Sequence, residues 1–269
     1  MRKKIVIIVI GVALLLEGIF LPYMHLSEGK TNTVKNSQKI QQPPIAAETT
    51  SFAKELTNEN QKERPEHNPI LTLRAKKIYS KNKKILVLVN AEHALKQSYQ
   101  ANLQPICNGR LNASACLYDA LVQMLADATA EGGFQYWIAS AWRSQEKQQK
   151  LIDEDVRSAM QRGLSYEDAL LETYKETMPA GHSEHETGLA LDILCSGNMN
   201  MDRSQAEEPG NIWLRENCCR YGFILRYPEE KEEITGVNYE PWHLRYVGKE
   251  AAKFLKKHNL TLEEYWQLL

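Results

Sequence analysis

The stretch PAGHSEHETGLALDI, residues 179–193, carries two histidines, two glutamates and an aspartate before it becomes apolar. Gly188 permits a sharp backbone turn after His185, and the LALD that follows reads as a strand that delivers Asp192. A carboxylate on the inner face of an apolar strand is costly unless it is paired or bound to a metal. The stretch therefore predicts half of a metal site, with an aspartate bonded to a neighbouring arginine as the alternative. It is not the H-E-x-x-H pattern, because HETGL has leucine where the second histidine belongs.

A second stretch, YEPWHLRYVG at residues 239–248, supplies a histidine and a carboxylate. Glu240 and His243 are three residues apart, so a turn or helical bend directs both to one point. A catalytic zinc ion takes three protein ligands and keeps one position for water. A carboxylate that does not bind the metal can then take the proton of that water. For the other large residues of the stretch we expect core packing: Trp242, Tyr246 and Val247.

A third stretch, SAWRSQEKQQKL at residues 140–151, places Arg143 where a strand passes into a helix. An arginine there can grip a carboxylate or stabilise an oxyanion, although a surface salt bridge is the simpler interpretation. Among the seven histidines, we expect solvated side chains for three and a loop position for one: His25, His67, His258 and His93. His182 stays a rival to His185 as a metal ligand.

The pattern of apolar residues predicts an α+β domain in which short strands alternate with helices. Expected strands cover residues 84–89, 134–140, 188–194 and 223–228. Expected helices cover residues 117–132, 143–160, 212–222, 248–258 and 261–269, and another begins at Ser165. Thr261 and Glu264 stand in capping-box positions, and Ser165 with Asp168 forms a similar helix start.

The N-terminus has the pattern of an export signal, with MRKK followed by an apolar run that continues past Glu17 to Met24. About 20 such residues match a bilayer thickness, and no A-x-A-like cleavage site follows. We predict an uncleaved signal anchor over residues 1–24, with a cleaved signal peptide as the alternative. Both place the rest of the chain outside the cytoplasm. Residues 25–82 are polar and predict a flexible linker, which leaves the folded domain at residues 83–269.

Charge and cysteine content narrow the function classes. Lys and Arg number 33 against 34 Asp and Glu, so no strong field attracts nucleic acid and we expect none as a partner. The five cysteines show no C-x-x-C spacing, which argues against a thiolate zinc site. An oxidising exterior permits disulfides, and the candidates are Cys107 with Cys116, and Cys195 with Cys218 or Cys219. Small buried thiols are the alternative.

Taken together, SAWRSQEKQQKL, SEHETGLALD and EPWHLRYVG closely resemble the VanY-type D-alanyl-D-alanine carboxypeptidases, zinc enzymes of the VanX and hedgehog-like superfamily. The pattern S-x-H-x-x-G-x-A-x-D is met at residues 183–192, E-x-W-H at 240–243 and S-x-[YW]-R-S at 140–144. The likeness spans about residues 83–260. It implies a hedgehog/DD-peptidase-like fold, with a small central antiparallel sheet flanked by helices.

The resemblance also assigns roles to individual residues. It implies a zinc ion held by His185, Asp192 and His243. It implies Glu240 as general base and then acid, with Arg143 polarising the scissile carbonyl or its oxyanion. It implies substrate contacts from Ser183, Gln148 and Trp242.

The implied enzyme is a membrane-tethered, extracytoplasmic metallocarboxypeptidase that removes the C-terminal D-alanine from peptidoglycan stem peptides. We expect it to act as a monomer. The catalytic motifs do not separate it from an L,D-carboxypeptidase that cuts tetrapeptide stems. A wall endopeptidase and a zinc-stabilised wall-binding module are further alternatives. Glu240 argues against the binding module, because a structural zinc site fills its fourth position with a ligand.

Overall fold

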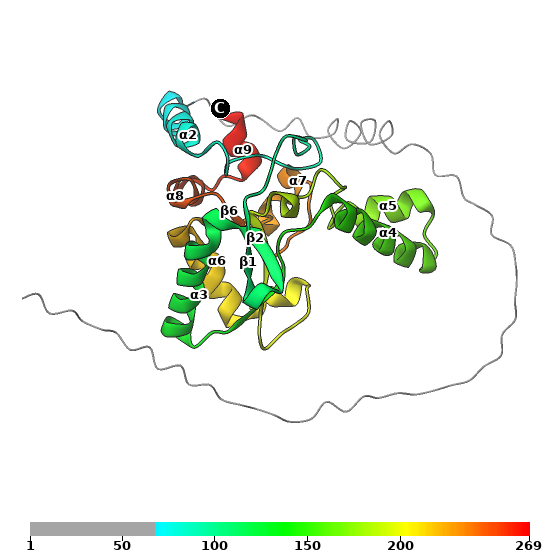
Figure 1. Ribbon diagram of the computed structural model, residues 1–269. Coiled ribbons are helices and arrows are strands. Elements are labelled where there is room, and N and C mark those ends of the chain that lie inside the picture. The colour runs from blue at the N-terminus through cyan, green and yellow to red at the C-terminus, as the bar shows by residue number, and fades with distance from the viewer. Residues whose placement is uncertain (1–67) are drawn as a thin grey trace, which may run out of the picture. The chain divides into compact units, whose positions relative to one another are not determined.

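The computed structural model describes residues 68–269 (Figure 1). The predicted signal anchor, residues 1–24, lies outside the described residues, as does the linker up to residue 67. Within residues 68–269, no helix is long and apolar enough to cross a bilayer.

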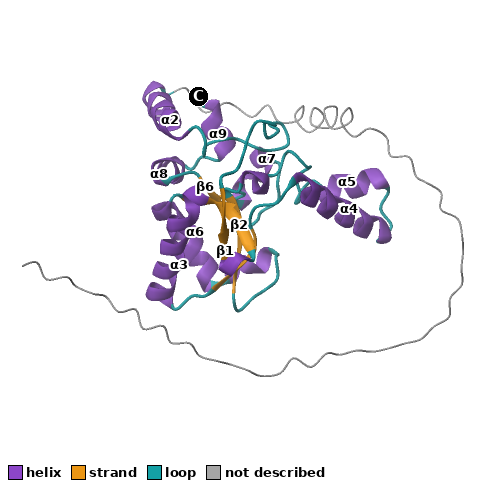
Figure 2. Cartoon of the chain, in the orientation of Figure 1, coloured by secondary structure: helices purple, strands orange, loops and turns teal. Residues whose placement is uncertain are grey.

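A four-stranded antiparallel sheet forms the centre of the domain. Its strand order is β3 (Tyr136–Ser140), β4 (Ala190–Cys195), β6 (His243–Tyr246) and β5 (Phe223–Leu225). A separate two-stranded sheet pairs β1 (Leu103–Ile106) with β2 (Leu111–Ser114). Figure 2 colours the strands of both sheets orange and the helices around them purple. The predicted α+β class with a small antiparallel sheet is confirmed.

Helices cover the sheet and enclose two main cores. The first core joins the sheet to α3 (Tyr118–Gly132) and α6 (Pro209–Tyr221). The second joins α2 (Pro69–Asn82), α8 (Lys249–His258) and α9 (Leu262–Gln267). The short helix α7 (Glu232–Thr235) lies between β5 and β6 in the chain.

The helices α4 (Gln145–Gln161) and α5 (Tyr166–Thr173) pair as a hairpin that extends away from the sheet (Figure 1). The hairpin has a small core of its own, formed by Ile152, Val156, Ala159 and Ala169. The predicted start of α5 at Ser165 is confirmed, because the Ser165 side chain accepts a hydrogen bond from the backbone N–H of Asp168. The capping box at α9 is also present, between Thr261 and Glu264.

The strand predicted over residues 84–89 is wrong, because this segment is a turn followed by irregular chain. Side chains bind its carbonyl groups in place of a neighbouring strand: Arg245 Nη2 donates to Ile85 O at 3.0 Å and to Val87 O at 2.9 Å. Trp266 Nε1 donates to Leu86 O at 3.0 Å. The apolar run correctly indicated burial, but it contained no information about the hydrogen-bond partner.

The linker prediction also needs correction at its C-terminal end, where α2 belongs to the folded domain. Asn68 caps this helix by accepting hydrogen bonds from two backbone N–H groups, and Pro69 occupies its first turn. Ala75 and Ile78 are buried against α8 and α9. Because only one narrow face of α2 is apolar, its composition looked like that of an unfolded linker.

All five cysteines lie within the described residues and all are free thiols, so the predicted disulfides are wrong. Cys195 packs against Gly210 in the first turn of α6, where a Cβ on the glycine would lie 3.0 Å from its sulfur. Cys218 lies two turns further along that helix, about 12 Å away at ~1.5 Å per residue, beyond the ~7 Å that a disulfide spans. Burial raises the pKa of Cys195 to about 11 and that of Cys218 to about 12. The alternative of small buried thiols therefore holds for this pair.

Candidate metal centre and catalytic pocket

The pairing of two central strands brings the predicted metal ligands together. Asp192 on β4 stands directly opposite His243 on β6, and Ser140 on β3 stands opposite Asp192 on its other side. The register of β3 shifts just before Ser140. Such irregularities redirect side chains at the edge of a site, and here the shift lies next to the Arg143 segment.

His185 comes from a short helical turn, Glu184–Thr187, that ends at Gly188. Gly188 has φ +72°, a conformation that favours glycine. An added Cβ would lie 2.9 Å from Leu103 Cδ2 and 3.1 Å from the Ser114 nitrogen. The glycine of the motif is therefore required both by its backbone angle and by the close approach of the β1–β2 sheet.

The three predicted ligands form a compact, buried group. His185 Nε2 lies 3.2 Å from Asp192 Oδ2, and His243 Nδ1 lies 3.2 Å from Asp192 Oδ1. One ligand atom from each residue lies within 4.8 Å of the others. Ligands of a tetrahedral zinc at ~2.0–2.1 Å are about 3.3 Å apart. The donor set and its spacing therefore fit a zinc ion.

The ring of His185 is oriented for metal binding by the backbone. Its Nδ1 lies 2.7 Å from the Ala141 carbonyl oxygen. Because a carbonyl only accepts, Nδ1 carries the proton and donates it, which leaves the lone pair of Nε2 for a metal. Burial acts to raise the pKa of Asp192, but the charges and hydrogen bonds of His185 and His243 outweigh burial and lower that pKa. The aspartate is thus held in its ligand form.

The outer ring nitrogen of His243 faces a residue that the sequence did not single out, Glu184. The carboxylate of Glu184 is fully buried, and its Oε2 lies 3.7 Å from His243 Nε2. Its Oε1 accepts from Arg226 Nε at 2.8 Å and pairs with Arg245 Nη1 at 2.7 Å. Burial opposes ionisation, but the two guanidinium groups overcome it and lower the pKa of Glu184. A carboxylate that two arginines hold in its charged form therefore faces the outer nitrogen of a metal ligand.

One signal could have predicted a buried carboxylate of this kind. Arg226 and Arg245 each interrupt an apolar strand, in FILRYP and HLRYV. A buried arginine needs an anionic partner. The sequence did not show which of its many carboxylates would be that partner.

Glu240 lies beside the metal group, as its spacing from His243 predicted. Its Oε2 is 3.3 Å from His243 Nδ1, and the His243 N–H donates to the Glu240 carbonyl oxygen at 3.1 Å, which closes the turn. Burial raises the pKa of Glu240, and the hydrogen bond with His243 only partly offsets this. A carboxyl with a raised pKa suits alternating roles as base and acid.

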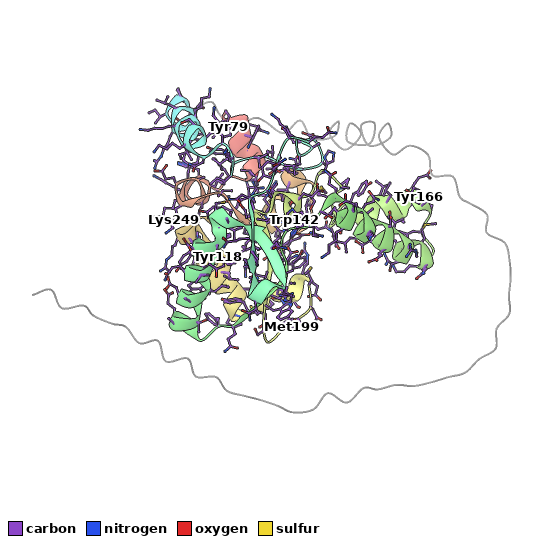
Figure 3. The ribbon with its side chains drawn as sticks, viewed as in Figure 1. Tyr79, Tyr118, Trp142, Tyr166, Met199 and Lys249 are labelled. Atoms are coloured by element: carbon purple, nitrogen blue, oxygen red, sulfur yellow. The ribbon has the colours of Figure 1, made fainter. Side chains whose placement is uncertain are left out.

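All eight predicted site residues line one pocket: Arg143, Gln148, Ser183, His185, Asp192, Glu240, Trp242 and His243. The Nε of Arg143 is buried without a hydrogen-bond partner. Gln148 donates from Nε2 to the Met178 carbonyl oxygen at 2.7 Å, and its buried Oε1 has no partner. Both residues therefore hold unused polar atoms at the pocket wall. The neighbouring Trp142, labelled in Figure 3, lies where β3 leads into α4.

His182 takes no part in the metal group. Its Nδ1 lies 2.8 Å from the Asn90 carbonyl oxygen, in the segment before the β1–β2 sheet. Sequence reasoning missed other pocket residues, among them Tyr227, whose ring centroid is 4.9 Å from that of His243. Burial, with the charge of Glu184 next in importance, raises the pKa of Tyr227, so its hydroxyl stays protonated.

Comparisons with known proteins agree with this geometry. A family model described as VanY, D-alanyl-D-alanine carboxypeptidase, matches residues 110–249. A D-alanyl-D-alanine carboxypeptidase of Enterococcus faecalis is 37% identical over 232 residues, which cover 85% of this chain and 80% of that protein.

Two solved structures extend the likeness to the fold. One is a variant of the vancomycin-resistance D,D-pentapeptidase VanY from a VanB-type cassette, in complex with Zn(II). It is 37% identical with a TM-score of 0.62, and the match covers 68% of this chain and 99% of that one. The LdcB LD-carboxypeptidase is 33% identical with a TM-score of 0.59, over 69% of this chain and 86% of that one. The chain therefore belongs to the VanY family of zinc-dependent D-alanyl-D-alanine carboxypeptidases.

Proposed function

We propose that this enzyme removes the C-terminal D-alanine of peptidoglycan stem peptides through attack of water on the last peptide bond. The convergence of His185, Asp192 and His243, with Glu240 beside them, carries the proposal. A structural zinc site has no use for an unliganded carboxylate next to the metal. The arrangement thus supports turnover and argues against a wall-binding module.

The roles of the residues follow from their places in the pocket. The three ligands would hold zinc, which when bound supplies Lewis acidity and lowers the pKa of water. Glu240 takes the proton of the attacking water and passes it to the leaving amine. Arg143 donates to the oxygen of the scissile carbonyl as negative charge develops there.

Peptide binding falls to the polar groups around this centre. Gln148 offers a fixed acceptor, because its Nε2 is already bound to the Met178 carbonyl group. An N–H group of the peptide would satisfy the free Oε1. Ser183 and Trp242 line the same pocket, where they would contact the peptide.

The similarity to LdcB supports a second candidate function, L,D cleavage of tetrapeptide stems. We favour the D,D reaction because the family model and the Enterococcus faecalis relative both bear that name. A wall endopeptidase would need room for peptide on both sides of the metal.

Release of free D-alanine from pentapeptide and tetrapeptide stems, with and without a chelator, tests the proposal. Chelator-sensitive release from the pentapeptide is the expected result. Release from the tetrapeptide alone would establish the L,D reaction. If the zinc-loaded protein releases D-alanine from neither peptide, a wall endopeptidase or a wall-binding module replaces the proposed carboxypeptidase.

We further propose that the enzyme is a membrane-tethered monomer with its catalytic domain outside the cytoplasm. The basic flank and apolar run of residues 1–24 support this location. Labelling of single cysteines on intact cells and on lysed cells would test it.

A further inference from the structure

Basic residues gather on two adjacent helices that do not line the pocket. Helices α2 and α8 pack together through Ala75, Ile78, Ala252 and Phe254. Ten exposed cationic side chains lie on these helices and on the turn after α2, and we call this set the α2–α8 basic face: Arg74, Lys76, Lys77, Lys81, Lys83, Lys84, Lys249, Lys253, Lys256 and Lys257.

The charge on this face is strongly segregated from the rest of the domain. Residues 68–84 and 249–258 contain those ten cations and one acidic residue, Glu250. The other described residues contain 14 Lys and Arg against 26 Asp and Glu. A chain that is nearly neutral overall thus presents one basic surface on an otherwise acidic domain.

Contacts show that the two helices form a single charged surface. Lys81 Nζ on α2 lies 3.5 Å from Glu250 Oε2 on α8. The Arg74 guanidinium lies 5.9 Å from the centre of the Phe254 ring. The charges on α2 and α8 therefore add in one local field.

Two large apolar side chains border this face. Ile70 and Leu73, in the first turns of α2, are 79% and 71% exposed, more than any other large hydrophobic residue of the described part. Exposed aliphatic residues next to basic ones are typical of helices that lie on membrane surfaces. A soluble polyanion would engage the cations but gain little from isoleucine and leucine.

The basic face is separated from the pocket. None of its ten residues lines the pocket. The α4–α5 hairpin, whose first turn lines the pocket, lies on the other side of the molecule, as Lys249 and Tyr166 mark in Figure 3. Contact of the basic face with a surface therefore leaves the pocket wall formed by the hairpin free.

We propose that the α2–α8 basic face binds the surface of an anionic phospholipid bilayer, with Ile70 and Leu73 entering the interface. The cations pair with lipid phosphates, and each one near such a surface strengthens binding about fivefold. This contact is independent of the predicted anchor and of the reaction. It keeps the α4–α5 hairpin, which forms one wall of the pocket, away from the lipid.

Vesicle binding by residues 68–269 tests the proposal without the predicted anchor. This part contains the complete pocket and both main cores, and it matches a solved VanY domain over 99% of that chain. The probes are vesicles of phosphatidylglycerol mixed with phosphatidylcholine, and vesicles of phosphatidylcholine alone. We expect co-sedimentation with the first only, and its loss at high salt. Equal binding to both, or to neither, would overturn the proposal.

Charge-reversal variants locate the surface. Lys76→Glu with Lys77→Glu should weaken binding about 25-fold or more. Lys147→Glu with Lys150→Glu, two exposed lysines on α4, makes the same change in net charge and should leave binding within about twofold. Equal losses in the two variants would show that net charge alone acts and would contradict a defined face. Far-ultraviolet circular dichroism and D-alanine release from a soluble peptide check that both variants are folded.

A third variant separates lipid from a soluble polyanion. Ile70→Ser with Leu73→Ser should weaken vesicle binding about tenfold or more, because the insertion of two aliphatic side chains is lost. Binding to soluble polyphosphate should be weaker than binding to vesicles and unchanged by this variant. If polyphosphate binds as tightly as the vesicles and the serine variant keeps full vesicle binding, the occupant is a polyanion and the lipid proposal is wrong.

Discussion

His185 and His243 lie on either side of Asp192 and contact its carboxylate at the same distance, 3.2 Å, but the protein orients them differently. His185 donates to a neutral backbone carbonyl, that of Ala141. His243 faces a buried carboxylate, Glu184, that two arginines surround. One half of the metal site thus depends on the path of the main chain, whereas the other depends on a network of buried charges.

This difference determines which substitutions can harm each half. The charged network extends beyond the site, because Arg226 also binds Glu263 on α9 through two hydrogen bonds. Single side-chain changes can therefore weaken the orientation of His243. The orientation of His185 responds to changes in backbone conformation instead, and Gly188 is the position where such a change is easiest to make.

The largest effect should come from Asp192, the residue that both halves share. Asp192→Ala should abolish zinc binding and reduce D-alanine release to background, because both histidines lose their common partner and the metal loses a ligand. Zinc content by atomic emission, together with turnover, measures this. Retention of one equivalent of zinc would show that the two histidines suffice.

Glu240→Gln should lower kcat by about 10²–10⁴-fold while zinc stays bound, because the amide cannot accept the proton of water. Glu240 contacts His243, but it belongs neither to the backbone contact of His185 nor to the charged network that faces His243. Turnover and zinc stoichiometry on the same sample separate its role from that of the ligands. Full hydrolysis by the zinc-loaded variant would contradict the proposed mechanism.

Glu184→Gln should weaken zinc affinity about 10- to 100-fold, as expected when the charged partner of a metal-binding histidine is lost. It should also lower the free energy of unfolding by about 3 kcal/mol, because two buried guanidinium groups lose their shared anion. Chelator competition measures the affinity, and urea denaturation measures the stability.

Glu263→Gln is the matched control for that substitution. It removes a carboxylate from the same Arg226 but does not touch His243. We expect it to lower stability while zinc affinity stays within about twofold. If the two variants lose zinc affinity equally, Glu184 acts only through the stability of the fold.

The smallest effect should come from Gly188→Ala, which we expect to lower the free energy of unfolding by about 1–3 kcal/mol. Alanine would be strained at φ +72° and would press on Leu103 and the Ser114 backbone. Gly133→Ala is the comparison, since Gly133 has φ +69° but nothing within 4 Å of an added Cβ. Thermal unfolding of both variants should show the larger loss at Gly188.

Much of the pocket could be predicted because residue type and spacing encode it locally. Glu240 and His243 are three positions apart in the sequence, and a single turn closes that distance. The glycine after His185 marks the bend before β4. Glu184 could not be predicted in the same way, because its role depends on two arginines that are distant from it in the sequence, Arg226 and Arg245. A residue that acts through long-range partners has no local pattern.

The errors in the fold have a similar origin. The run at residues 84–89 is buried as its composition indicates, yet Arg245 and Trp266 bind its carbonyl groups in place of a strand. The polar composition of α2 masked a narrow buried face that only α8 and α9 complete. The predicted disulfide between Cys195 and Cys218 is wrong because Cys195 packs against Gly210 in the first turn of α6. Cys218 lies two turns further along that helix.

The α4–α5 hairpin gives the enzyme a form of modularity. Its small core is separate from the cores around the sheet, while Gln148 in its first helix and the segment from Glu176 to Met178 after its second form one wall of the pocket. Selection can therefore alter this wall, and with it the range of peptides accepted, without disturbing the metal ligands on the sheet. Substrate preference can therefore change in the hairpin, while the metal ligands on the sheet stay the same.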